Sequence, residues 1–441
     1  MLRKRVNMSN LSVVRTGFIF ACTLLLTACS GQRVMMPTPN EAVDKHPGIY
    51  DNLHEDLKTT EVPLFYVTDR VPERDDKGNL QYGYGRSPSL AFGSTVIDMG
   101  ADMSWDELLN ESRANKRSKE VPMHRVSINE IVRGPNAPIP FTEVDGIIVE
   151  DPEYVAIRQA AAQEFREAVV EWLDKTPRKE IFIFVHGFHN SFDDAAFTMA
   201  ELWHFLGRYG VPIVYTWPAG HPGLFGYTYD RESSEFTVFH LRQLIELMAG
   251  FPEVEKINVI GHSRGTDVVV TALRELTIEV RAVGKDPKKA LKLHNIVLAA
   301  PDLDAQVAGQ RIIGDFLAWS ADRFTIYASP EDSAIGWSRK LFDSPAGRVG
   351  NIEVDKMTPI VREQMEVGNS PLAVINFFPS SDNKITGKDG FGHSYFRNAP
   401  TVSSDLIIML RDDADPGSPE RPLEYIGAKF WKVPPGYPNP D

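Results

Sequence analysis

The stretch Lys256–Leu273, KINVIGHSRGTDVVVTAL, places a serine between two glycines at the point where a strand-like run changes into a helical pattern. β-forming residues precede Gly261, and an apolar pattern with helical spacing follows Gly265. A serine on a strained strand–turn–helix corner is held above a sheet, and the flanking glycines leave room for the tight turn and for a substrate. Because G-x-S-x-G also occurs by chance in chains of this length, the interpretation of Ser263 depends on the rest of the chain.

Short apolar runs alternate with helical stretches from Glu153 onward. The runs lack the alternation of polar and apolar residues that marks a half-buried strand, so they indicate an α/β fold with a mostly parallel central sheet and helices on both faces. Reactive groups in such a sheet gather at the carboxyl ends of the strands, where Ser263 is expected to lie. The expected strands cover residues 181–188, 212–217, 257–263, 294–301, 323–329 and 372–378. The expected helices cover residues 153–174, 193–208, 230–249, 264–283, 304–319 and 401–411.

Residues 1–28 are typical of an export signal peptide. Basic residues precede a short apolar run, Gly17–Ala28, which is too short to span a bilayer. The tetrapeptide Leu26–Cys29 (LTAC) resembles a bacterial lipobox, which implies lipidation of Cys29, and Ser30 favours the outer membrane, facing the periplasm. The alternatives are an ordinary signal peptide with a stray cysteine, or a short transmembrane anchor. Cys22 would leave with the signal, so we expect no disulfide in a lipid-anchored protein of the cell envelope.

The rest of the chain divides into four parts. Residues 29–61 are polar and contain prolines, which favours a flexible tether. Residues 62–152 are expected to add N-terminal strands that complete the sheet, residues 153–411 to form the catalytic core, and residues 412–441 to form a C-terminal extension. The strand-like runs of the second part cover residues 62–68, 89–99 and 123–132. A formal net charge of −13 without basic clusters argues against nucleic acid as a partner.

Two histidines follow Ser263 in the chain. A serine hydrolase of the α/β-hydrolase fold carries its triad in the order Ser, Asp or Glu, and His. His294 opens an expected strand and so would lie at the wrong end of the sheet. His393 lies in a glycine-rich loop (GKDGFGHSYF) after the last expected strand, where the general base is needed. The alternative is that His393 is a surface-loop histidine.

The expected acid is Asp332, in the segment RFTIYASPEDSAI. It would hold the tautomer of His393 and stabilise the imidazolium without taking the proton itself. The residues 329–332 (SPED) also have the pattern of a helix start, so Asp332 could instead serve as a cap. Asp302 and Asp304, in the segment APDLD, compete for the acid's role or cap the next helix.

An oxyanion hole needs two backbone N–H groups that point at the developing negative charge. Arg264, directly after the serine, is expected to supply one, and Phe188, in the segment FVHGFHNSF, to supply the other. The expected substrate-pocket residues are His186, Trp217 and Tyr227. Their alternative role is to pack the loops in which they lie.

Nine segments occur in order along the chain: VPLFYVTDR, YGRSPSLAFG, FVHGFHNSF, TWPAG, YTYDRESSEF, VIGHSRGTD, APDLD, YASPEDSA and GHSYF. Together they resemble a bacterial α/β-hydrolase family catalogued as domain of unknown function 900, over residues 62–410. The resemblance implies the α/β-hydrolase fold, with Ser263, Asp332 and His393 as the triad. Many members of that family look like exported lipoproteins.

These observations predict a lipid-anchored serine hydrolase. It would act on ester-like acyl bonds of a small-molecule or lipid substrate, as a carboxylesterase or lipase-like enzyme, through an acyl-enzyme at Ser263. Thioester or amide hydrolysis and acyl transfer would use the same residues. The alternative is a non-catalytic envelope lipoprotein that uses the fold for binding or scaffolding. No cofactor and no metal are expected, because the histidines of HGFHN lack partner ligands at zinc spacing. The sequence alone sets no oligomeric state.

Overall fold

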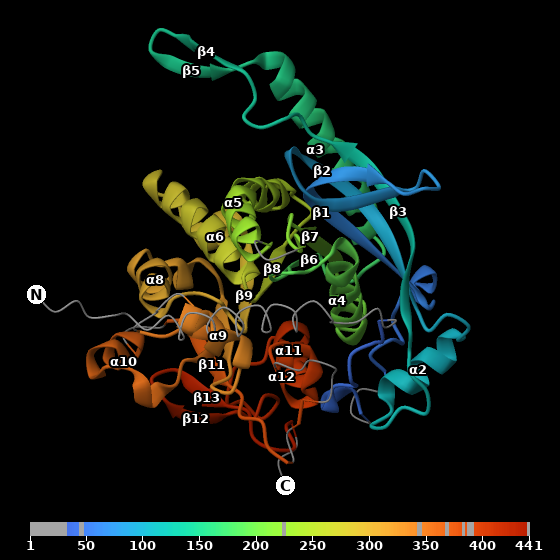
Figure 1. Cartoon of the computed structure of the whole chain (residues 1–441), viewed down its shortest axis with the longest axis vertical. Coiled ribbons are helices and arrows are strands. Elements are labelled where there is room, and N and C mark those ends of the chain that lie inside the picture. Colours follow the sequence, from blue (N-terminus) through green and yellow to red (C-terminus); the bar gives the residue numbers. More distant parts are fainter. Residues whose placement is uncertain are drawn as a thin grey trace, which may run out of the picture.

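The centre of the molecule is one large mixed sheet (Figure 1). The computed structural model describes residues 33–43, 48–222, 226–341, 346–366, 370–381, 384–385 and 392–438. Within this part, eleven strands form the sheet, in the order β12-β13-β11-β10-β9-β8-β6-β7-β1-β2-β3. The strands from β13 to β1 run parallel, whereas β12 at one end and β2 and β3 at the other are antiparallel to their neighbours. The expected mostly parallel central sheet is therefore confirmed.

Nine of the eleven strands of this sheet overlap the expected ranges, whereas β12 and β13 were not expected. The strands are β1 (Glu61–Arg74), β2 (Leu80–Met99), β3 (Met123–Arg133), β6 (Glu180–Val185), β7 (Val211–Thr216), β8 (Lys256–His262), β9 (Leu293–Ala299), β10 (Arg323–Ala328), β11 (Leu372–Asn376), β12 (Glu424–Gly427) and β13 (Phe430–Lys432). The strand β6 shows why the central strands are apolar throughout. Ile181, Ile183 and Val185 enter one hydrophobic core, and Phe182 and Phe184 enter the other, on the opposite face of the sheet.

Helices cover both faces of the sheet, as expected. They are α2 (Trp105–Arg113), α3 (Pro152–Leu173), α4 (Phe192–Phe205), α5 (Gly226–Gly250), α6 (Gly265–Ala282), α7 (Pro287–Leu291), α8 (Ala305–Ala308), α9 (Ser333–Leu341), α10 (Pro359–Glu366), α11 (Tyr395–Asn398) and α12 (Pro400–Asp412). The helices α3, α5 and α6 contribute to one core, and α4 and α12 to the other. The parallel sheet is thus buried on both sides, which leaves its carboxyl edge to carry reactive groups.

The helix expected over residues 304–319 is broken into three short pieces. The chain forms α8, then a π-helical segment, Gly309–Gly314, and then a 3-10 turn, Leu317–Ser320. Phe316, between the last two, has a φ of 63°, which ends the right-handed helical path. The prediction of helical structure over residues 304–319 is therefore confirmed, but the prediction of a single continuous helix is wrong.

Part of the expected tether is folded onto the body of the protein. Met35 and Met36 are buried in the same core as α4 and α12. The carboxylate of Glu201 accepts hydrogen bonds from Arg33 (2.7 Å) and from the N–H of Met36 (2.8 Å). The prediction of a flexible tether over residues 29–61 is therefore wrong for the described part of that range. Apolar side chains of this segment are buried in the core, and its backbone is hydrogen-bonded to the body of the protein. Cys29 and residues 1–28 lie outside the described residues.

Within the expected C-terminal extension, residues 424–432 add two strands to the sheet, which was not predicted from the sequence. The strand β13 pairs in parallel with β11, and β12 pairs with β13. Arg421 is wholly buried and holds Asp405 of α12 through two hydrogen bonds of 2.8 Å, so this segment is anchored to the body.

Residues 141–150 do not join the central sheet, contrary to the expectation for residues 62–152. They form a separate two-stranded sheet of β4 (Phe141–Val144) and β5 (Ile147–Glu150), which leads into α3. In Figure 1 this hairpin and the start of α3 project from the top of the molecule. In the described part of the chain, no helix has both the length and the apolar character needed to cross a membrane.

Candidate active site

Ser263 occupies a strained corner at the carboxyl end of β8. Its φ is 52°, in the left-handed region that a residue other than glycine seldom adopts. The Ser263 N–H donates to the carbonyl of Ala299 (3.0 Å), and the Ser263 carbonyl accepts from the N–H (3.1 Å) and the hydroxyl (2.7 Å) of Thr266. These bonds tie the corner to the adjacent strand and to the first turn of α6, so the serine is held in the geometry of a nucleophile elbow.

Two glycines allow the loop after β6 to lie against this corner. A Cβ atom on Gly265 would be 2.2 Å from the carbonyl oxygen of His186, and a Cβ on Gly187 would be 2.7 Å from the Cβ of Ser263. Real side chains do not tolerate such distances, so only glycine fits at either place without a shift of the backbone. The loop that follows β6 is therefore in direct contact with the serine.

His393 and Asp332 form a hydrogen-bonded pair although 61 residues separate them. The Nδ1 atom of His393 lies 2.7 Å from Oδ2 of Asp332, whose side chain is fully buried. The other oxygen, Oδ1, accepts from the N–H of Ile335 (3.1 Å) in the first turn of α9. Asp332 thus caps a helix with one oxygen and holds the histidine with the other, and the two roles that the sequence offered as alternatives coexist.

The imidazole of His393 lies close to the serine corner. Its ring centroid is 5.0 Å from that of His262, the residue that directly precedes Ser263. Within the described part of the chain, no hydrogen bond joins the Ser263 hydroxyl to His393 or to another residue. Such contacts are often long without a substrate and tighten when one binds.

The competing candidates have other partners. Asp302 faces Arg348 at 3.5 Å and accepts from the hydroxyl of Ser338 at 2.6 Å. Asp304 caps α8 by accepting from two backbone N–H groups. His294 lies at the start of β9 and pairs with two aspartates, Asp322 and Asp413, at the opposite end of the sheet from Ser263. The structure therefore brings His393 together with Asp332 and with none of these alternatives.

The two expected oxyanion donors flank Ser263. Phe188 lies one residue beyond Gly187, in the loop that touches the serine, and Arg264 follows the serine directly. Neither backbone N–H donates to an acceptor within the described residues. Both groups are therefore free to bind an oxygen atom of a substrate, which is what an oxyanion hole requires.

His186 and Trp217 support this loop and do not contact solvent. Both side chains are wholly buried, and their rings are stacked with centroids 5.2 Å apart. The Nε2 atom of His186 accepts from the N–H of Trp217 (3.1 Å), and Nδ1 lies 2.9 Å from the carbonyl of Gly187. Burial, with Arg70 nearby, lowers the pKa of His186 to about 3, so the ring is neutral. The expectation that His186 and Trp217 line a substrate pocket is wrong, because the loop needs them for its own packing.

Tyr227 is the expected pocket residue that remains partly exposed. Its ring centroid is 4.9 Å from that of Phe188, and its hydroxyl is 3.4 Å from Asp302. Burial raises the pKa of Tyr227 to about 12, so its hydroxyl stays protonated near neutral pH. Tyr227 and Phe188 therefore form an aromatic contact beside the candidate oxyanion loop.

Arg70 also supports the candidate site, although it was not predicted from the sequence. This arginine is wholly buried at β1 and donates to the carbonyls of Asn190 (2.9 Å) and Ala219 (3.1 Å). It therefore joins the loop after β6 to the loop after β7. Burial lowers its pKa to about 10, which leaves it charged at neutral pH. The available signal was a cation three residues after the end of the apolar run of β1, within VPLFYVTDR.

Asp230 was missed as well. It lies in the first turns of α5 and accepts from the N–H groups of Gly220 (2.7 Å), His221 (3.2 Å) and His189 (3.4 Å). These donors belong to the same two loops that Arg70 joins. The buried side chains of Arg70 and Asp230 thus both bind backbone groups of the loops after β6 and β7, and so fix these loops relative to each other.

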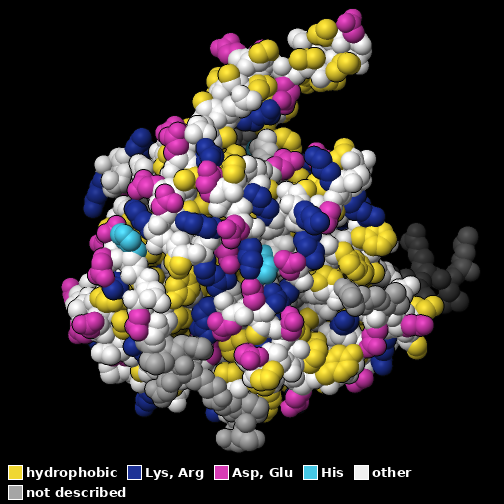
Figure 2. Space-filling model, turned by 180° about the vertical axis from the view of Figure 1, so that it is seen from behind, with side chains coloured by type: hydrophobic (Ala, Val, Ile, Leu, Met, Phe, Trp, Pro, Cys, Tyr) yellow, Lys and Arg dark blue, Asp and Glu magenta, His cyan; other side chains and the backbone are white. Residues whose placement is uncertain are grey.

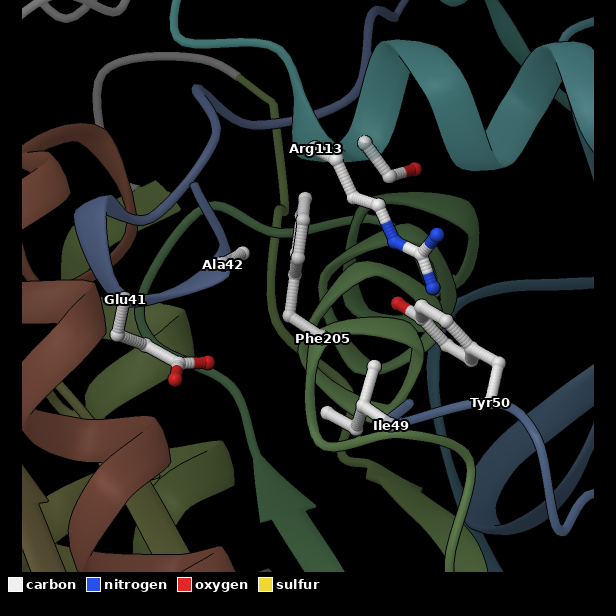
Figure 3. A pocket seen from close by; sticks show the side chains of 7 residues that line it. Glu41, Ala42, Ile49, Tyr50, Arg113 and Phe205 are labelled. Atoms are coloured by element: carbon white, nitrogen blue, oxygen red, sulfur yellow. The ribbon is translucent and has the colours of Figure 1, made fainter. Parts of the chain in front are cut away.

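A small recess lies elsewhere, between the N-terminal segment, α2 and α4 (Figure 3). Its lining residues are Glu41, Ala42, Ile49, Tyr50, Ser112, Arg113 and Phe205. None of them belongs to the site around Ser263. Among the described residues, no group of three or more His, Cys, Asp or Glu side chains could hold a metal ion.

A mostly parallel sheet with a strained serine after β8, and an acid and a histidine after β10 and β11, has the architecture of an α/β hydrolase. Residues 161–411 match the family model described as alpha/beta hydrolase of unknown function (DUF900). The chain therefore belongs to this family, as the resemblance of its motifs predicted.

Other comparisons add little. A search of curated proteins gives no match. An uncharacterized protein from Bacillus cereus ATCC 10987 is 11% identical, with a TM-score of 0.32, over 60% of this chain and 71% of that chain. A lipase-esterase related protein from Clostridium acetobutylicum ATCC 824 is 14% identical, with a TM-score of 0.19, over 46% of this chain and 74% of that chain. Similarities this weak carry no functional information, so the family match and the site geometry carry the assignment.

Proposed function

We propose that this α/β hydrolase is a serine hydrolase that cleaves ester-like acyl bonds through Ser263, His393 and Asp332. The observation that carries the proposal is the 2.7 Å contact between His393 and a fully buried Asp332, beside a serine on a strained corner. In the triad of a serine hydrolase, a buried acid positions the imidazole in this way so that it can accept and return a proton.

The first half of the reaction forms an acyl-enzyme. The Oγ atom of Ser263 attacks the carbonyl carbon while Nε2 of His393 takes the hydroxyl proton. The N–H groups of Phe188 and Arg264 stabilise the resulting oxyanion. The intermediate collapses when the proton on Nε2 passes to the leaving oxygen, and an alcohol departs. Asp332 stabilises the imidazolium throughout and remains ionised.

The second half restores the enzyme. Water attacks the acyl carbon, Nε2 of His393 takes one of its protons, and the second tetrahedral intermediate expels the oxygen of Ser263. That oxygen regains the proton from Nε2, and a carboxylic acid is released. A carboxylic ester of a small molecule or a lipid is the substrate class we favour, by analogy with the chemistry common to this fold.

Hydrolysis of p-nitrophenyl acyl esters of increasing chain length tests the proposal. We expect Ser263→Ala and His393→Ala to abolish turnover, and Ser127→Ala, an exposed serine on β3, to leave it unchanged. A folded protein that hydrolyses none of the esters, or whose turnover survives Ser263→Ala, would exclude this mechanism. The first of these outcomes would favour the alternative of a non-catalytic binding lipoprotein.

We also propose that Cys29 carries the lipid that anchors the protein in the cell envelope, facing the periplasm from the outer membrane. The proposal is supported by the LTAC sequence after an apolar run. Metabolic labelling with an alkyne fatty acid should mark the wild-type chain and not Cys29→Ser. Equal labelling of the two chains would contradict it.

A further inference from the structure

The N-terminal segment, residues 33–43, and the segment that carries His393 meet at one buried carboxylate, that of Glu201 in α4. Charged side chains are spread over the surface that Figure 2 shows, where water solvates them, whereas Glu201 is 0% exposed. Its carboxylate accepts hydrogen bonds from Arg33 (2.7 Å), from the N–H of Met36 (2.8 Å) and from Arg397 (2.6 Å). Arg397 belongs to α11, which begins two residues after His393.

Two arginines keep this carboxylate ionised inside the protein. Burial alone would raise the pKa of Glu201, but Arg33 and Arg397 outweigh burial, so the pKa lies below its ordinary value. Burying an ion pair costs so much desolvation that its net contribution to stability is often small. The three donors come from two segments that are distant in the sequence, so the effect of Glu201 is to fix both segments against α4.

The short helix α11 depends on side-chain anchors for its position. It is four residues long, so few backbone hydrogen bonds of its own support it. The hydroxyl of Tyr395 donates to the carbonyl of Tyr327 in β10 (2.8 Å), and Arg397 reaches α4, which lies beside α11 in Figure 1. The bond from Arg397 to Glu201 therefore fixes the side of α11 that faces α4.

The position of α11 affects the reacting groups directly. Phe396 of α11 packs its ring on that of His262, with centroids 4.7 Å apart, and His262 directly precedes Ser263. Because His393 lies two residues before the helix, a shift of α11 would move its imidazole relative to the serine hydroxyl. A misplacement of about 1 Å between reacting groups can slow an enzyme by about 10²-fold.

We propose that Glu201 is a positioning residue for His393, acting through Arg397, and that the N-terminal segment completes the surroundings of its carboxylate. This inference rests on the proposed hydrolase function. Arg33 and Arg397 bind the same oxygen, Oε1, and the N–H of Met36 binds Oε2, so loss of the N-terminal segment would open the link to water. Turnover therefore depends on the segment that follows the proposed lipid site, and cleavage of the chain within it would reduce hydrolysis.

Steady-state hydrolysis of a p-nitrophenyl ester by the full chain in mild detergent tests this proposal. Glu201→Gln should lower kcat at least about tenfold and change KM by less than about twofold, because the base is misplaced while the substrate contacts remain. Arg397→Gln should have the same effect. Arg397→Lys should keep at least about half of kcat, since a single contact needs a cation and not a planar fork. Circular dichroism checks that each variant is folded.

Glu41→Gln is the matched control. Glu41 is 1% exposed and, like Glu201, links the N-terminal segment to a helix, through two hydrogen bonds from Arg411 (2.7 and 2.8 Å). Arg411 lies in the last turn of α12, and Glu41 lines the recess of Figure 3, away from the candidate active site. This variant loses an equivalent buried pair, so it should unfold at lower urea concentration but keep the kcat and KM of the wild type.

Hydrogen exchange followed by mass spectrometry tests the positioning without a substrate. The backbone N–H groups of Arg397 and Asn398 donate to the carbonyl of Ser394, so their exchange reports the order of α11. Exchange there should be faster in Glu201→Gln than in the wild type and unchanged in Glu41→Gln.

The two measurements separate this inference from the proposed function. A wild type that hydrolyses no ester would overturn the proposed function, and the exchange rates would still decide whether Glu201 holds α11. Wild-type exchange at α11 in Glu201→Gln would overturn the inference, as would wild-type kcat in that variant or an equal loss of kcat in Glu41→Gln.

Discussion

At the residue scale, Asp332 shows how one side chain of the candidate site serves two purposes. The two oxygens of Asp332 bind different partners, one a histidine ring and the other a helix N-terminus. The helix fixes the position of the carboxylate, and the carboxylate fixes the position of His393. A residue type that could cap the helix without holding the histidine should therefore separate stability from catalysis.

Asp332→Asn makes that separation. Asparagine caps helices about as well as aspartate does, so α9 should keep its first turn. Its amide cannot stabilise an imidazolium as a carboxylate does, so ester hydrolysis should fall by about 10³- to 10⁴-fold. The control Glu331→Gln removes a charge from the exposed neighbour and should change the rate by less than about twofold. Equal losses in the two variants would show that Asp332 has no specific role.

Gly265→Ala probes the contact between the corner and the loop after β6. The added methyl group would lie 2.2 Å from a backbone oxygen, so the free energy of unfolding should fall by about 2 kcal/mol or more. Gly309→Ala is the control, because nothing lies within 4 Å of its Cβ position and its φ of −55° is helical. This variant should be neutral or slightly stabilised. Urea denaturation of both variants measures the difference, and similar values for the two would contradict the account.

Ser263, Asp332 and His393 could be proposed as a triad from the sequence because the order of the triad along this fold is fixed. Arg70 and Asp230 could not be assigned in the same way. Their partners are backbone groups of two loops, and backbone groups leave no trace in the sequence. His186 and Trp217 were placed in the right loops but given the wrong role, since burial is decided by packing around them.

At the element scale, the central strands were predictable because both of their faces are buried and apolar, and the long helices because their apolar residues recur at helical spacing. Elements that depend on distant partners were not. The short strand β13 pairs with β11, and β12 pairs with β13, whereas Met35 and Met36 are buried against α4 and α12. Local sequence carries little information about such contacts.

Arg70→Lys tests how the loops around the site are held together. Lysine cannot reach three carbonyls from one planar group, so the carbonyls of Asn190 or Ala219 would lose their donor. We expect the unfolding free energy to fall by about 1–3 kcal/mol and ester hydrolysis to slow. Arg74→Lys, on the exposed end of the same strand, is the control and should change neither quantity. If the two variants behave alike in both assays, Arg70 does not position the loops.

At the scale of the whole molecule, stability should depend on pH through buried histidines. Burial lowers the pKa of His186 to about 3 and those of His204 and His262 well below their ordinary value. Below pH 6.5 the unfolded chain binds protons at these sites and the folded chain does not, so acid favours unfolding. Each of these histidines should lower the free energy of unfolding by about 1 kcal/mol when the pH falls from 7 to 5.5.

Urea denaturation at these two pH values measures the fall. His204→Gln, in α4, should reduce the fall by about 1 kcal/mol, because glutamine does not titrate. The matched control is His54→Gln, since His54 is an exposed histidine near the N-terminus and should leave the fall unchanged. A wild type whose stability does not change over this range would show that these rings are not held neutral.

The central claim is that Ser263 is an activated nucleophile, and covalent labelling tests it most directly. The purified chain is treated with a fluorophosphonate probe, and the modified peptide is identified by mass spectrometry. The account predicts one adduct, on Ser263, which is lost in Ser263→Ala and strongly slowed in His393→Ala. A folded wild type that takes up no probe, or one modified at another residue, would contradict it.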